Sequence, residues 1–87
     1  MEKQKYGVRD FMVHAVEINI EVNRRKLVYK MESVNDYDAF NKAEESLRNA
    51  EKKILSMKGQ EPTFQLIVDI GNLLKEVIKV EEDIKDL

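Results

Sequence analysis

The sequence contains no cysteine and no tryptophan, and its 87 residues include only one histidine, one proline and three glycines. Without cysteine the chain can form neither a disulfide nor a thiolate metal site. This absence fits a reducing compartment, so we expect a cytoplasmic protein. The glycines stand apart at positions 7, 59 and 71, and so no glycine-rich loop could cradle a phosphate.

Long apolar runs are also missing. No stretch approaches the roughly 20 consecutive apolar residues that a membrane-spanning helix needs. The polar start of the chain leads into no apolar segment of the signal-peptide type. We therefore expect a soluble protein with no membrane partner.

The catalytic and metal-binding motifs that can be recognised from spacing are absent as well. His14 is followed at the third and fourth positions by Glu17 and Ile18, which do not complete a histidine metal pair. The acidic runs at 44–45 and 81–83 are typical of solvated helix faces. No serine stands in a nucleophile elbow. We expect a protein that is not an enzyme and that holds no metal or cofactor.

What the chain does contain is charge of both signs. Charged residues make up 37% of the sequence, and the net charge is −2. Residues 1–30 hold seven basic and four acidic side chains, whereas residues 31–87 hold eight and thirteen. We expect a single domain over residues 1–87 that begins with a flexible basic arm over residues 1–9. The asymmetry indicates either two surfaces with different partners or an attraction between the two parts.

The first third of the chain has the pattern of a β-hairpin. Residues 16–22 alternate strictly between apolar and polar, which is the period of a strand. A hairpin over residues 11–33, turning at residues 23–26, would set each apolar residue opposite an apolar partner, such as Ile20 opposite Tyr29.

The alternative is one long helix over residues 8–33. Its apolar residues would form two stripes, one of Phe11, Ala15, Ile18, Val22 and Tyr29 and one of Met12, Val16, Ile20, Leu27 and Met31. Asn19, Asn23, Lys26 and Lys30 would lie between the stripes, where a single buried face would not place them. The many β-branched residues also lose side-chain entropy in a helix. The sequence therefore favours the hairpin.

Two helices are expected after it, over residues 35–58 and 62–86. Each carries an apolar stripe at alternating three- and four-residue spacing. Asn35 suits the N-cap of the first helix, and Pro62 suits the first turn of the second. The second helix also carries another stripe, which predicts burial on two sides: Ile67, Gly71, Leu74 and Ile78.

The predicted fold is α+β, with a two-stranded antiparallel β-hairpin packed on an antiparallel helical hairpin (ββαα). An all-α three-helix bundle is the alternative. A lone two-stranded ribbon is marginally stable and leaves both edges open. The sequence therefore predicts a homodimer or a higher homo-oligomer.

The candidate binding residues are Arg24, Arg25, Lys26 and Tyr29, at or near the expected hairpin tip. Three cations there could contact the phosphate oxygens of a nucleic acid, or a small nucleotide-like anion held between subunits. The net negative charge of the chain counts against nucleic acid. A solvated turn is the simpler interpretation.

A chain with no catalytic set and more apolar surface than it can hide is typical of a protein-interaction module. We expect a stoichiometric regulator, inhibitor or adaptor with a protein partner, of the kind often found in phages and other mobile elements. The alternatives are nucleic-acid binding through the basic tip and sequestration of a small anionic ligand.

Overall fold

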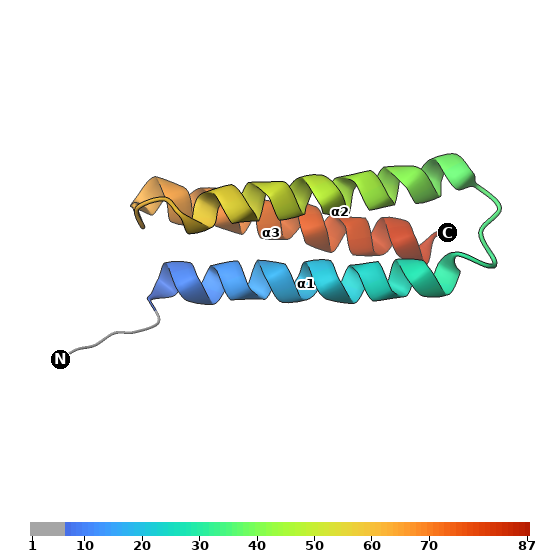
Figure 1. Cartoon of the computed structure of the whole chain (residues 1–87), viewed down its shortest axis with the longest axis horizontal. Helices are drawn as coiled ribbons and strands as arrows, with labels where there is room; N and C mark the ends of the chain where they lie inside the picture. Colours follow the sequence, from blue (N-terminus) through green and yellow to red (C-terminus); the bar gives the residue numbers. More distant parts are fainter. Residues whose placement is uncertain (1–6) are drawn as a thin grey trace.

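A computed structural model describes residues 7–87 (Figure 1). These residues form three long helices: α1 (Val8–Lys30), α2 (Tyr37–Lys58) and α3 (Phe64–Lys85). The helices run up, down and up, so that α1 and α3 point the same way and α2 runs against both (Figure 1). Each helix packs against the other two.

The predicted β-hairpin over residues 11–33 is wrong. Residues 8–30 form one continuous helix, and no strand occurs among residues 7–87. The alternative, an all-α three-helix bundle, is the fold of the chain. The expected arm over residues 1–9 falls mostly outside the described residues, and its last two residues already belong to α1.

The alternating pattern that indicated a strand has a helical origin. Side chains two residues apart on an α-helix point about 200° apart, so they lie on nearly opposite faces. Val16 and Ile20 face the core with 0% and 4% exposure, whereas Ile18 and Val22 face outward with 47% and 43%. Two apolar stripes on opposite faces of one helix therefore reproduce the alternation of a strand, because the polar residues between them point sideways.

The polar residues that argued against a helix are accommodated by the neighbouring helices. Asn23 lies in the core. Lys26 reaches across to α3, where its Nζ donates to Glu81 at 2.7 Å. The Nζ of Lys30 donates to the backbone carbonyl of Lys85 at 3.4 Å. Both lysines are half-buried, and the ammonium group of each keeps a hydrogen-bond partner on α3 or at its end.

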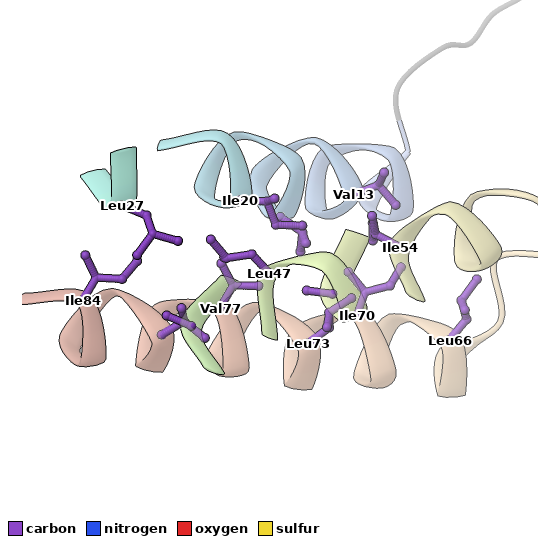
Figure 2. Packing of buried hydrophobic residues seen from close by; sticks show 14 residues of the cluster. Val13, Ile20, Leu27, Leu47, Ile54, Leu66, Ile70, Leu73, Val77 and Ile84 are labelled. Carbon is purple, nitrogen blue, oxygen red and sulfur yellow. The ribbon is translucent and has the colours of Figure 1, made fainter. Parts of the chain in front are cut away.

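The core runs the length of the bundle and has one seam from each helix (Figure 2). In every seam the buried positions recur at three- and four-residue intervals, which is the heptad spacing of coiled-coil packing. The small side chains on α2 let its neighbours approach closely. The buried apolar residues of the three seams are Val13, Val16, Ile20 and Leu27; Ala43, Leu47, Ala50 and Ile54; and Leu66, Ile70, Leu73, Val77, Val80 and Ile84.

The helices α2 and α3 correspond to the two helices expected, and each begins two residues later than predicted. Asp36, and not Asn35, is the N-cap of α2, and its carboxylate accepts a hydrogen bond from the backbone N–H three residues on. Thr63 caps α3 in the same way, so that Pro62 lies just before the cap. Each cap satisfies a backbone donor that the first helical turn leaves free.

Asn23 is the one buried polar side chain among the described residues, with 1% exposure. Its Nδ2 donates to the backbone carbonyl of Val77 at 3.1 Å, and its Oδ1 has no hydrogen-bond partner. It occupies a seam position of α1, between Ile20 and Leu27. A single amide in a helical seam costs stability but disfavours other registers, because a slip would leave both of its polar atoms unpaired.

The two faces of α1 can be compared with one matched pair of substitutions. Ile20→Ala should lower the free energy of unfolding by about 2–5 kcal/mol, because it leaves a cavity in a packed core. Ile18→Ala should change it by roughly 0.5 kcal/mol or less, because Ile18 faces outward. Urea titration at low protein concentration measures both. Equal losses, as expected for two residues on one face of a strand, would contradict the helix.

Substitution of Asn23 tests the cost of its unpaired oxygen. Asn23→Leu should raise the free energy of unfolding by about 1 kcal/mol, because it removes a buried acceptor that has no partner. Asn72→Leu, on the exposed face of α3, is the control and should change it by about 0.5 kcal/mol or less. Destabilisation of the Asn23 variant would show instead that its bond to Val77 outweighs the unpaired oxygen.

Candidate functional site

The four candidate binding residues lie on α1 and not at a turn. Consecutive side chains on a helix point about 100° apart. Arg24 accordingly reaches toward α2, Arg25 faces solvent and Lys26 reaches toward α3. Tyr29 lies one turn beyond Arg25 and is 86% exposed. The structure brings Arg24, Arg25 and Tyr29 around one open hollow on the surface of α1, whereas Lys26 points away from it.

Each of the three cations is paired with a carboxylate of the same chain. Arg24 donates two hydrogen bonds to Glu51 of α2, at 2.8 and 3.3 Å. Arg25 donates at 2.9 Å to a carboxylate one turn earlier on α1. Lys26 donates to Glu81. The prediction that these cations cluster at a hairpin tip is therefore wrong. A binding role for these residues stays a prediction.

The pair of Lys26 and Glu81 joins α1 to α3. The hydrogen bond and the positive charge of Lys26 hold the pKa of Glu81 below its ordinary value of 4.5. As the pH falls below 4.5, the unfolded chain is protonated at Glu81 before the folded chain is. The pair thus stabilises the fold above that pH, and this contribution is lost as the pH falls through the lowered pKa of the folded state.

Removal of the ammonium group should reverse this shift. Lys26→Met should raise the pKa of Glu81 back toward 4.5, as measured by carbon-13 NMR titration of the side-chain carboxyl. Arg25→Met is the control, because it removes a neighbouring cation that pairs with a different carboxylate, and it should leave the pKa of Glu81 unchanged. If the pKa of Glu81 does not move in the Lys26 variant, the two helices are not joined by this pair in solution.

The outward face of α1 carries an apolar stripe of its own, which we call the outer stripe: Phe11, Ala15, Ile18 and Val22. Its intervals of four, three and four residues are those of a coiled-coil seam. Phe11 is 66% exposed, Ile18 and Val22 are nearly half exposed, and Ala15 is half-buried. The core residues of α1 face the opposite side, and none of the helices formed by residues 7–87 covers the outer stripe.

The outer stripe has apolar extensions at its ends and polar groups along one edge. Val8 extends the spacing three residues before Phe11. Beyond Val22 the spacing continues through Arg25 to Tyr29. His14 and Glu21 stand along one edge. An open hollow of about 460 Å³ is lined by Asp10, Phe11, His14, Ala15 and Ile18. All of its walls come from α1, and so it is a feature of one exposed helix face and not an enclosed ligand cavity.

Exposed apolar side chains are concentrated on α1. Of the twelve large apolar residues exposed within residues 7–87, six lie in α1, three in α3 and two in α2. Single exposed apolar residues are normal on any protein surface and need no explanation. A row of them along one helix is a less common arrangement, and it is typical of surfaces that pack against another molecule.

The second stripe of α3, which predicted burial on two sides, is largely covered by α1. Ile67, Gly71 and Leu74 are half-buried, and only Ile78 is exposed. A Cβ placed on Gly71 would lie 3.5 Å from the methyl group of Met12, an ordinary contact distance. The second buried side that this stripe predicted for α3 is therefore mostly provided inside the bundle.

The signal for the outer stripe was present in the sequence, as one of the two stripes of the alternative helix. It was missed as a site because the favoured hairpin places Ile18 and Val22 on the same face as Val16 and Ile20, and so leaves no separate outward stripe. The candidate cations were consecutive in the sequence, but the carboxylates that pair with Arg24 and Lys26, Glu51 and Glu81, come from other helices.

Among residues 7–87, no group of histidine, aspartate and glutamate side chains is placed to hold a metal ion. None of the three helices combines the length and the apolar character that crossing a membrane requires. Comparisons of the chain with models of protein families, with curated proteins and with solved structures give no match.

Proposed function

We propose that the chain is a small non-enzymatic protein-interaction module that binds another protein stoichiometrically through the outer stripe of α1, as a regulator, inhibitor or adaptor. The observation that supports this is the outer stripe itself, four apolar residues at heptad spacing on a face that no described helix covers. Such a stripe is what one helix presents to another in coiled coils and in helix-in-groove complexes.

The surface has the layout of a binding interface. Phe11 offers an exposed aromatic ring, the kind of side chain that anchors interfaces. Ala15, one turn further along, leaves space for a bulky side chain from a partner. His14, Glu21 and Arg25 line the stripe with polar groups, so that an apolar centre is bordered by a polar rim.

Binding of nucleic acid or of a nucleotide-like anion has less support. The cations on which both would depend are already paired with Glu21, Glu51 and Glu81, and a phosphate would have to displace those carboxylates. The compartment we propose is the cytoplasm, because the chain relies on no disulfide.

A photoreactive side chain can test which face is bound. Benzoylphenylalanine in place of Ile18 should cross-link to one discrete protein in the native cells, because this position lies within the outer stripe. The same residue in place of Leu55, an exposed apolar side chain that stands alone on α2, is the matched control and should give no discrete product. Gel electrophoresis followed by mass spectrometry identifies each product.

A second substitution shows whether the cross-link depends on the stripe. Phe11→Lys should reduce the product at position 18 by about tenfold, because it removes the aromatic anchor. It should leave the free energy of unfolding within about 0.5 kcal/mol, since Phe11 is exposed. Equal products at positions 18 and 55, or a product at 18 that survives Phe11→Lys, would contradict the proposed function.

A further inference from the structure

We propose that the outer stripe binds the outer stripe of a second copy of this chain, with the two α1 helices antiparallel about a two-fold axis level with residues 16 and 17. This inference rests on the proposed function, because it names the occupant of the same surface. A two-fold axis requires that if residue i contacts residue j of the other copy, residue j also contacts residue i.

The side chains of the outer stripe match one another in size in this register. Phe11 packs against the partner's Val22, and Ala15 packs against the partner's Ile18. The two-fold axis repeats both contacts, so the four stripe residues of each copy together form four layers. Each layer joins a larger side chain to a smaller one, and this alternation fills a helical seam without voids or overlap.

A parallel pair of α1 helices fits the same residues less well. Each side chain would face its own copy, so that two Phe11 rings would crowd one layer and two Ala15 methyl groups would leave the next one thin. Arg25 would also face Arg25 of the partner subunit, with like charges opposed. In the antiparallel register Arg25 lies beyond the four layers, opposite Val8 at the end of the helix.

The polar edge of the stripe is complementary to itself in the antiparallel register. His14 and Glu21 stand on the same edge, seven residues apart, and so they are two turns apart along one side of α1. Antiparallel packing brings His14 beside the partner's Glu21 twice, once on each side of the axis. The imidazole N–H of His14 can then donate to the partner's Glu21. That carboxylate can accept it, because the hydrogen bond from Arg25 of its own chain goes to Oε2 alone.

The rest of the bundle leaves room for this packing. Both α2 and α3 lie on the core side of α1, opposite the outer stripe, so the two bundles would stand back to back (Figure 1). Four of the exposed large apolar residues of α1, Val8, Phe11, Ile18 and Val22, lie where this register covers them, and at on the order of 100 Å² each they offer roughly 400 Å² per chain. Specific, stable interfaces begin at about 600 Å² per partner, so this apolar area corresponds to a small dimer whose formation depends on concentration.

Engineered cysteines can test the direction of packing, because the chain has no cysteine of its own. Val8→Cys and Arg25→Cys leave the four stripe residues intact. The antiparallel register places position 8 of one copy opposite position 25 of the other, whereas a parallel pair would separate them by about 26 Å. A disulfide requires Cα atoms within about 7 Å. Mixing the two variants, each with its own tag, under mild oxidation should give the mixed disulfide in about tenfold excess over either self-linked product.

Two controls make the cross-link interpretable. Ser46→Cys, on the exposed face of α2, reports random collision and should give no product above background. Circular dichroism should show the same helix content for every variant. An excess of self-linked products over the mixed disulfide would contradict the antiparallel register.

The mass in solution separates this inference from the proposed function. Sedimentation should give twice the chain mass of 10.2 kDa at high concentration. Ile18→Lys, which brings two cations close to the axis, should return the mass to 10.2 kDa. An unaltered chain that stays at 10.2 kDa at every concentration would overturn the self-pairing. If such a monomer still cross-linked from position 18 to a different protein, the proposed function would stand and only the occupant would be wrong.

Discussion

A helix packed against two neighbours can bury only one of its faces, and α1 has two apolar faces of the same spacing. One polar residue interrupts each of them: Asn23 in the inner seam and Arg25 on the outer face. Burial of a neutral amide that keeps one hydrogen bond costs far less than burial of an unpaired cation. This difference accounts for the face of α1 that turns to the core, and hence for the face that remains available to another molecule.

The charges of the chain act mainly within the bundle. The basic first third and the acidic remainder meet where cations of α1 reach carboxylates of α2 and α3, as in the pairs Arg24–Glu51 and Lys26–Glu81. A further pair runs the other way, from Lys58 of α2 to Glu17 of α1. Exposed ion pairs of this kind contribute little free energy each. Their effect is to fix how the helices are aligned, and the hydrophobic core supplies most of the stability.

The sequence was sufficient for α2 and α3 and insufficient for α1. Each of the later helices has one dominant stripe at three- and four-residue spacing, bounded by residues that stop or start helices. In α1 the β-branched residues at positions 16, 18, 20 and 22 satisfy a strand and a two-faced helix equally well. The packing that decides between them comes from α2 and α3, and local sequence does not contain it. The prediction of a cation cluster was wrong for the same reason. Consecutive side chains lie close together at a turn, whereas on a helix they point in different directions.

An odd number of antiparallel helices sends the two ends of the fold in opposite directions. The first turn of α1 and the last turn of α3 lie at opposite ends of the bundle, which are separated by about the length of a 22-residue helix, roughly 33 Å (Figure 1). A helical hairpin or a four-helix bundle would instead return the chain to the end where it started. Whatever is joined before α1 is thus held at a fixed distance from whatever is joined after α3, because the bundle between them is a rigid set of packed helices.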